Sequence, residues 1–417
     1  MITTSKLEVK SVSTWCVSSS GLRPRIVIPI CVGSNPIMHP NTMDIYTMKH
    51  YCAMPFNHVS VGNNGDYQIC CIHPVPDKHK KNINQTGVDE WLQNPYLHEV
   101  KSAFAEDQQH PGCQRCWQQE TSGTQSIRQV QAKEYKIIGA KPMQSRILHI
   151  EVAVGNLCNL SCVMCSEYNS SAILAENRQL GIAVLDQREF IWTESAFENL
   201  QQILDYRPRV IHLRGGEPLY NKRILELLDN FPAEHARNTL LHLTTNATTW
   251  TPQWQQTLSK FKSVRMMLSV DAVDELSEYI RYPSKFAQVE HNIKQIITCS
   301  NVKPVIHATV QNLNIMHIGQ VVQWAKRMNI YLMLDLLVQP DYLEITNLPP
   351  VLKQQAIDHL HTVLAQDLDP HIQSEISAYK TALETATFDQ PLWQRFVDNI
   401  SRRDAVRENS HRDFLKY

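Results

Sequence analysis

Three cysteines stand close together in the middle of the chain, in the order Cys158-Asn-Leu-Ser-Cys162-Val-Met-Cys165. Because three and then two residues separate them, the loop can turn all three sulfurs toward one point. A cluster of four irons and four sulfides needs one protein ligand for each iron, so this loop leaves one iron without a cysteine. Metal sites with an open coordination position are usually reactive rather than structural. The triplet therefore predicts a reactive iron–sulfur centre.

Composition limits what kind of protein surrounds the triplet. The chain has 417 residues, more than one domain usually holds, so about two domains are expected. It has 40 basic and 41 acidic side chains, whereas nucleic-acid-binding domains usually carry a basic excess. The short basic run at residues 78–81 is typical of a solvated loop. The charge balance therefore does not favour a nucleic-acid partner.

Targeting signals and cysteine content bear on the compartment. The chain does not begin with a charged segment followed by an apolar one, so no secretory signal is predicted. The apolar run at residues 26–32 is too short to span a bilayer. We therefore expect a cytoplasmic protein without a membrane partner. In a reducing compartment its 11 cysteines indicate metal or redox chemistry rather than disulfides.

A small cysteine-bearing unit precedes the triplet at residues 46–135, after an extension at residues 1–45. A β-hairpin is predicted in it, with a strand at 58–62, the turn signal Asn63-Asn64-Gly65-Asp66 and a return strand at 67–71. One helical stretch is predicted around residues 91–104.

The cysteines of this unit could form a second metal site. Cys52, Cys70, Cys113 and Cys116 would ligate one iron–sulfur cluster fully, and a zinc ion with four sulfur ligands has the same ligand count. Cys70 and Cys71 are neighbours on the predicted return strand, so their side chains should point to opposite faces. Only one of the two should therefore reach the metal.

Strand and helix patterns alternate between residues 140 and 345. Six strands are predicted, at 146–154, 209–213, 240–243, 265–270, 305–310 and 331–337. Such alternation implies a parallel sheet, and six strand–helix units are too few for a closed eight-stranded barrel. We predict the α/β class, with an open, partial TIM-like (β/α)6 barrel. Residues 346–417 should form a helical C-terminal region that begins with an amphipathic helix at 351–365.

Residues with chemical potential fall at the ends of these strands. Ligands of parallel barrels sit at the carboxyl ends of the strands. The residues that fall at or just beyond predicted strand ends are the triplet, Gly215-Gly216-Glu217-Pro218, Asn246, Asp271 and Gln311. The cysteine spacing does not require these residues to fall at strand ends. Their shared position therefore supports one common site.

The triplet after the first strand and Gly-Gly-Glu-Pro after the second resemble the radical S-adenosylmethionine (SAM) superfamily over roughly residues 145–340. Met164 departs from the pattern, since an aromatic residue often precedes the third cysteine; this affects cluster packing only. The resemblance implies a 4Fe–4S cluster on Cys158, Cys162 and Cys165, with SAM chelating the open iron. An external electron donor would reduce the cluster, SAM would be cleaved to methionine and a 5′-deoxyadenosyl radical, and the radical would take a hydrogen atom from substrate.

The same resemblance implies roles for the strand-end residues. Gly215 and Gly216 would let the backbone approach SAM closely, and Glu217 suits its amino group. Ser269 and Asp271 resemble positions that contact the ribose or carboxylate of SAM. Arg281, in Tyr279-Ile-Arg-Tyr-Pro, resembles an arginine that pairs with that carboxylate. For the two remaining polar residues, Asn246 and Gln311, a purely structural role stays open.

The amino-terminal unit resembles the auxiliary-cluster module called SPASM, or its half-sized version, twitch. The resemblance lies in Cys52, in Gly65 followed at a fixed spacing by Cys70, and in Cys113-x2-Cys116. In that family the module usually follows the radical SAM core, whereas here it precedes it. The short cysteine set implies one auxiliary cluster of the 4Fe–4S type. The glycine spacing favours Cys70 over Cys71 as the ligand.

SPASM and twitch proteins mostly modify ribosomally made peptides, so a precursor peptide is the expected substrate. The modification could be epimerisation, cross-linking, oxidation or backbone excision. An epimerase needs a hydrogen-atom donor, for which Cys31, Cys71 and Cys299 are candidates. The first 45 residues are short for a leader-binding domain, so a separate protein could recognise the leader. Two alternatives stay open: a radical SAM enzyme acting on a small molecule or RNA, and a non-catalytic iron–sulfur or zinc module.

Overall fold

The computed structural model describes residues 13–18, 21–26 and 48–416, except 124, 142 and 183. Most of the extension at residues 1–45, Cys31 included, lies outside the described residues. Its two described segments, β1 (Ser13–Ser18) and β2 (Gly21–Ile26), form an antiparallel pair.

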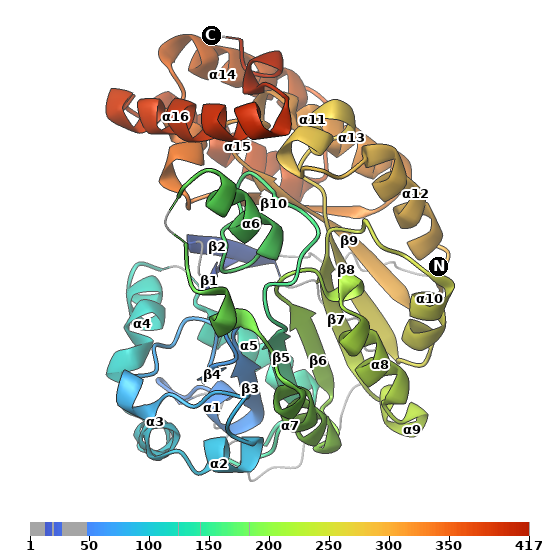
Figure 1. Cartoon of the computed structure of the whole chain (residues 1–417). Coiled ribbons are helices and arrows are strands. Elements are labelled where there is room, and N and C mark those ends of the chain that lie inside the picture. The colour runs from blue at the N-terminus through green and yellow to red at the C-terminus, as the bar shows by residue number, and fades with distance from the viewer. Residues whose placement is uncertain are drawn as a thin grey trace, which may run out of the picture.

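The centre of the molecule is an open sheet of eight strands in the order β10-β9-β8-β7-β6-β5-β3-β4 (Figure 1). Six consecutive strands are parallel neighbours: β5 (His149–Ala153), β6 (Val210–Arg214), β7 (Leu240–Thr245), β8 (Ser263–Ser269), β9 (Val302–Val310) and β10 (Tyr331–Leu336). The two edge strands, β10 and β4, do not pair with each other, so the sheet does not close. The predicted partial (β/α)6 barrel is confirmed.

Helices follow the parallel strands and cover their outer side (Figure 1). They are α6 (Ser171–Gln179), α7 (Glu194–Asp205), α8 (Lys222–Asn230), α9 (Ala233–Ala236), α10 (Pro252–Ser259), α11 (Asp274–Ile280), α12 (Phe286–Ile296) and α13 (Ile318–Met328). The helix α13 shows why they form. Ile318, Val321, Val322 and Ala325 recur at helical spacing and are buried. Asn329, directly after the helix, adopts the left-handed conformation typical of a helix C-terminus.

The amino-terminal unit is part of the same sheet. Its strand β3 (His58–Val61) pairs in parallel with β5, and β4 (Tyr67–Gln68) returns antiparallel to β3. The predicted hairpin is confirmed, with Gly65 at a positive φ of 82° in its turn. The prediction that the return strand runs to residue 71 is wrong, because β4 ends at Gln68 and Cys70 and Cys71 lie in the following bend and turn. Strand alternation therefore does not govern those two cysteines.

Short helices complete this unit. They are α1 (Met54–Asn57), α2 (Val88–Leu92), α3 (Pro95–Ala105), α4 (Gln114–Thr121) and α5 (Ile127–Ile137). The single helical stretch predicted at 91–104 is two helices, because Asn94 is extended and caps α3 through a bond from the Tyr96 N–H, with Pro95 as its first residue. Buried apolar side chains of this unit and of the barrel belong to one continuous core.

The C-terminal region is helical as predicted. It consists of α14 (Pro350–Leu364), α15 (Pro370–Thr385) and α16 (Gln390–Arg407), and α16 crosses near α6 and α11 (Figure 1). The Tyr379 hydroxyl on α15 donates to the Leu334 carbonyl on β10 at 3.0 Å, which attaches the region to the barrel edge. None of the helices in the described part of the chain combines the length and apolarity that crossing a membrane requires.

Candidate functional site

A cavity of about 670 Å³ opens within the sheet and reaches the carboxyl ends of its strands. Its walls come from both the barrel and the amino-terminal unit. Nine of the residues predicted to form the site line it: Cys158, Cys162, Cys165, Gly215, Gly216, Glu217, Asn246, Ser269 and Arg281. Two others, Asp271 and Gln311, do not line it.

The loop that carries the triplet follows β5 and is held mainly by residues distant in sequence. The Ser161 N–H donates to the Tyr282 carbonyl at 2.6 Å, and the Val163 N–H donates to the Ile280 carbonyl at 2.8 Å. The loop therefore pairs with the segment that carries Arg281. Ser171, at the start of α6, accepts a bond from the Cys158 N–H at 3.1 Å.

The triplet sulfurs sit in an environment that disfavours free thiolates. Burial raises the pKa of the Cys158 thiol, and the neighbouring Cys162 raises it further. Burial also raises the pKa of Cys162, although the positive charge of Arg281 opposes that shift. Such thiols lose their protons when a metal binds to the sulfur atoms. The loop is therefore suited to bind a metal cluster, with release of protons.

The glycine pair allows close packing around the triplet. Gly215 and Gly216 have positive φ values of 81° and 49°, a region that residues with a Cβ rarely adopt. A Cβ at Gly216 would collide with the Leu157 carbonyl, directly before the triplet, and one at Gly215 would collide with Asn63. The glycines thus fit the turn against the cysteine loop and the amino-terminal unit as well as lining the cavity.

Glu217 ties this turn to the end of β7. Its carboxylate is 2 % exposed and accepts hydrogen bonds from the Thr245 hydroxyl at 2.6 Å, the Asn246 N–H at 2.6 Å and the Leu219 N–H at 3.0 Å. Burial raises the pKa of Glu217 to about 6, while these bonds act to lower it. The result is a fixed carboxylate at the cavity wall with room for one further donor.

Asp271 and Arg281 form a buried ion pair, with 2.7 Å between Asp271 Oδ2 and Arg281 Nε. Asp271 is fully buried and also accepts from the Thr309 N–H at 2.8 Å. Although burial opposes it, the charge of Asp271 raises the pKa of Arg281. Arg281 reaches toward the cluster loop, where its Nη1 lies 3.9 Å from Cys162 Sγ. Asp271 therefore stands behind Arg281 and orients it, and does not itself face the cavity.

Asn246 makes structural contacts, whereas the Gln311 side chain is buried without a hydrogen-bond partner among the described residues. The Asn246 amide donates to Asn159 Oδ1, inside the triplet, at 3.0 Å and accepts from the Thr248 N–H at 2.9 Å. Gln311 is fully buried, and its backbone N–H donates to Asn314 Oδ1 at 2.8 Å. Asn246 thus links the cysteine loop to the end of β7, whereas Gln311 is buried and does not line the cavity.

A second, much smaller cavity of about 20 Å³ lies in the amino-terminal unit. The four predicted ligands Cys52, Cys70, Cys113 and Cys116 all line it. Cys71 does not, and lines the large cavity instead. Burial raises the pKa of Cys52 to about 12 and also raises that of Cys70. The geometry thus brings four thiols together and separates Cys70 from Cys71.

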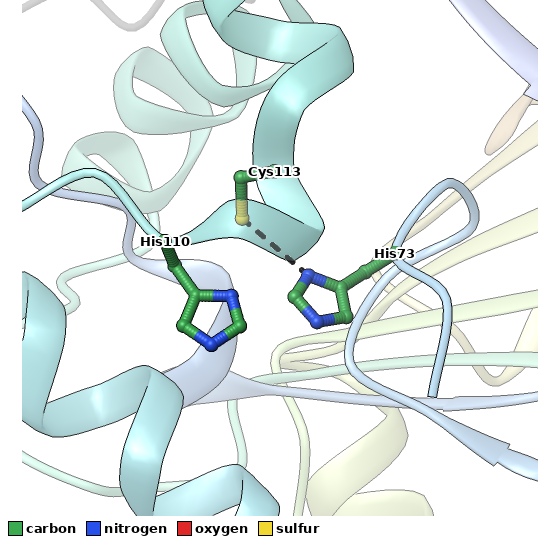
Figure 2. A group of neighbouring side chains, drawn as sticks. All are labelled: His73, His110 and Cys113. Atoms are coloured by element: carbon green, nitrogen blue, oxygen red, sulfur yellow. Dashed lines mark hydrogen bonds between the residues drawn. The ribbon is translucent and has the colours of Figure 1, made fainter. Parts of the chain in front are cut away.

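Two histidines near this second cavity were not predicted from the sequence, and one of them, His73, lines it. His73, His110 and Cys113 place one ligand atom each within 4.8 Å of one another (Figure 2). Both rings are buried, and burial followed by the neighbouring His110 lowers the pKa of His73 to about 4. The signal for them was weak, since His73 stands two residues after Cys71 and His110 three before Cys113 without a known spacing.

The C-terminal region also reaches the triplet, which the sequence did not indicate. Arg407, on α16, donates to the Ser161 carbonyl at 2.5 Å and to Glu176 Oε2 at 2.9 Å. Arg403, one turn earlier, donates to the Asn177 side chain at 3.0 Å. Buried ion pairs between α16 and α6 therefore join the two helices next to the cysteine loop.

The two donor sets fit two different iron–sulfur sites. In the large cavity, the loop offers three thiols whose charges influence one another, with Glu217 close by. In the small cavity, four thiols meet, so the protein could ligate every iron of a cluster.

Comparisons with known proteins agree with this division. Residues 152–323 match the radical SAM superfamily, and residues 52–117 match the SPASM iron–sulfur cluster-binding domain. A search of curated proteins found no match.

Several solved structures are similar at low identity. The structure of native anSMEcpe with bound AdoMet is 19% identical over 51% of this chain and 58% of that chain, with a TM-score of 0.37. The structure of Streptococcus suis SuiB bound to precursor peptide SuiA is 15% identical over 74% of this chain and 71% of that chain, with a TM-score of 0.38. The first match thus spans little more than half of its counterpart. The match at residues 152–323 implies a 4Fe–4S cluster and SAM, and the match at residues 52–117, which precedes it, implies an auxiliary iron–sulfur cluster.

Proposed function

We propose that the protein is a radical SAM enzyme that reductively cleaves SAM and modifies a ribosomally made precursor peptide. The observation that carries the proposal is that the cysteine triplet, Glu217 and Arg281 share one cavity at the ends of parallel strands. When bound, the 4Fe–4S cluster would supply the electron that splits SAM into methionine and a 5′-deoxyadenosyl radical.

The chain's own residues would bind the amino-acid end of SAM. That end carries a carboxylate and an amine, and the cavity offers one fixed charge for each. Arg281, held by Asp271, suits the carboxylate. Glu217, with three hydrogen bonds in place, suits the amine. Because both groups are already oriented, binding would require little reorganisation, and their burial would keep water from a reactive radical.

The peptide substrate rests on the kind of auxiliary domain. Proteins resembling SPASM and twitch modules mostly act on ribosomally made peptides. In this chain the auxiliary unit also forms part of the cavity wall, through residues such as Asn63, Cys71 and Gln131. A substrate in the cavity would therefore contact both units. Cys71, the candidate hydrogen-atom donor that lines the cavity, is compatible with epimerisation.

A small polar substrate is the second candidate, and the deeper wall of the cavity favours it. Glu151, His212, His242 and Arg265 occupy directly neighbouring positions on β5, β6, β7 and β8, and all four line the cavity. Such a row of polar groups would bind a small polar molecule better than an aliphatic side chain.

The enzymatic claim is tested by measuring 5′-deoxyadenosine after anaerobic reconstitution, reduction and addition of SAM. Replacing Cys158, Cys162 and Cys165 together with Ala should abolish the product. Cys299→Ala is the matched control, since Cys299 lines neither cavity and should leave the product unchanged. If the intact protein, loaded with both clusters, forms no 5′-deoxyadenosine, it is not a radical SAM enzyme.

Substrate class is tested separately, by incubating the active protein with short peptides encoded beside its gene. A mass change in one of them, dependent on SAM and on the triplet, would support peptide modification. Turnover of SAM without a change in any peptide, but with a change in a small polar compound, would favour the second candidate.

A further inference from the structure

His73 stands between the two cavities. Its side chain lines both of them and is 5 % exposed. Its backbone N–H donates to the Cys70 carbonyl at 3.3 Å, so His73 belongs to the same turn as Cys70, a candidate cluster ligand. Its ring points at another, with Nδ1 at 3.4 Å from Cys113 Sγ (Figure 2).

The hydrogen-bond partner of Nε2 determines whether Nδ1 offers a proton or a lone pair to the sulfur. The Tyr96 hydroxyl lies 3.1 Å from His73 Nε2 and 3.4 Å from the Pro74 carbonyl. A hydroxyl donates one proton, and a neutral imidazole has one N–H and one lone pair. If Tyr96 donates along the shorter contact, Nε2 is the acceptor and Nδ1 carries the proton. Because a metal-bound cysteine is a thiolate, it accepts an N–H and favours this tautomer.

Gly112 provides the space for this ring. A Cβ at position 112 would lie 2.5 Å from His73 Cε1 and 2.6 Å from Nε2, too close for the ring to keep its place. The requirement for glycine between Pro111 and Cys113 therefore comes from His73. Since no positive φ is involved at this position, space alone explains the glycine.

The neighbouring His110 is oriented toward other protein groups than Cys113. Its Nδ1 accepts a hydrogen bond from the Gly112 N–H at 3.1 Å, and its Nε2 faces Glu99 Oε1 at 3.5 Å. Both nitrogens of His110 therefore face protein groups. Cys113 lines the small cavity together with Cys52, Cys70 and Cys116, which we call the four-thiol cavity. Of the two histidines, His73 is the one whose ring nitrogen contacts the Cys113 sulfur.

We propose that His73 is a positioning residue of the auxiliary cluster, where its Nδ1–H donates a hydrogen bond to the Cys113 thiolate and raises the reduction potential. This inference rests on the proposed function, because it requires a cluster on the four cysteines. Reduction adds negative charge that the cluster shares with its sulfur ligands. A donor to one of these sulfurs therefore stabilises the reduced state more than the oxidised state.

The test uses the full-length protein with Cys158, Cys162 and Cys165 replaced by Ala, so that only the auxiliary cluster can load. Its midpoint potential is measured by redox titration followed by electron paramagnetic resonance, alone and with His73→Leu or His73→Asn. Leu removes the donor, whereas an Asn amide can place an N–H near the position of Nδ1. We expect His73→Leu to lower the reduction equilibrium constant about tenfold, or about 59 mV for one electron, and His73→Asn to restore most of it.

Gly112→Ala is an independent variant that keeps the histidine but displaces its ring, and it should reproduce the shift of His73→Leu. Iron content of about four per chain identifies the variants that are loaded. An unshifted midpoint in loaded His73→Leu or Gly112→Ala protein would overturn this inference alone. A strong nitrogen coupling in the parent spectrum, lost in His73→Leu, would also overturn it by making His73 a ligand. Absence of iron from the parent would overturn the auxiliary cluster together with the inference.

Discussion

Arg407 should be the residue of the C-terminal region on which the cysteine triplet depends most. Its guanidinium is buried and donates to the Ser161 carbonyl, inside the triplet, at 2.5 Å. It also donates to both carboxylate oxygens of Glu176, at 2.9 and 3.0 Å, and lies 5.0 Å from the centre of the Tyr282 ring. Arg407→Met keeps the apolar stem and removes every one of these polar contacts.

The cost of this substitution follows from what it leaves behind. Removing one partner of a buried ion pair usually costs about 3–5 kcal/mol, because the other charge is left uncompensated. Glu176 would still be paired with Arg403, so we expect the lower end, about 3 kcal/mol in the free energy of unfolding. With an unfolding entropy of about 2.1 cal/mol/K per residue, a chain of 417 residues would lose about 3 °C in Tm.

The assay compares thermal unfolding of apo-protein and iron content after reconstitution, in Arg407→Met and Arg402→Met. Arg402 lies on the same helix but is exposed, so its substitution should change neither quantity. Because Arg407→Met also frees the Ser161 carbonyl, iron should fall toward about four per chain while the auxiliary cluster is kept. If Arg407→Met unfolds and binds iron like Arg402→Met, the brace between α16 and the cysteine loop has no energetic importance.

Four further predictions concern the two cavities. Cys70→Ala should lose about four irons per chain and Cys71→Ala none, because Cys70 alone of the pair lines the four-thiol cavity; equal iron loss would contradict that geometry. The raised pKa of Glu217, about 6, should make SAM bind more weakly as the pH falls through 6, since the carboxylate that accepts the amine becomes protonated. Calorimetric titration of cluster-loaded protein should show this slope, and Glu217→Gln should flatten it. The stability of the apo-protein should depend on pH in the opposite direction. Because burying the ionised Glu217 carboxylate costs free energy, the apo-protein should lose stability as the pH rises from about 4.5 to 6. Asp271→Asn should weaken SAM binding by about tenfold, or about 1.4 kcal/mol, through misplacement of Arg281, and wild-type affinity in this variant would show that Arg281 holds its position unaided.

The barrel could be predicted from sequence because its signals are local. Each predicted strand between residues 146 and 337 overlaps an observed one, since a run of apolar residues followed by a helical repeat specifies its own element. The pairing of β3 with β5 could not be predicted in this way. It joins His58 to His149 across a long stretch of chain, and strand partners so distant leave no mark on either segment.

The direction of side chains at strand ends could not be predicted from the sequence either. Asp271 and Gln311 follow β8 and β9 as expected, yet neither lines the cavity. Position after a strand indicates which end of the sheet a residue occupies. Which way it turns depends on contacts such as that between Asp271 and the Thr309 N–H on the neighbouring strand. The same limit applies to Cys70 and Cys71, because their strand ends three residues earlier than predicted.

The cysteine spacing alone does not fix the geometry of the triplet, because three distant segments hold the loop. The segment that carries Arg281 pairs with the backbone of the loop, and Arg407 binds the Ser161 carbonyl of the loop. On the auxiliary side, the Asn63 amide donates to Asn169 Oδ1 at 2.7 Å, just beyond the loop. Since Asn63 follows β3, and β3 pairs with the strand that leads into the triplet, the amino-terminal unit is part of the support of the cysteine triplet. Removing that unit should therefore disturb the triplet as well as the auxiliary cluster, even though the two cysteine sets share no residue.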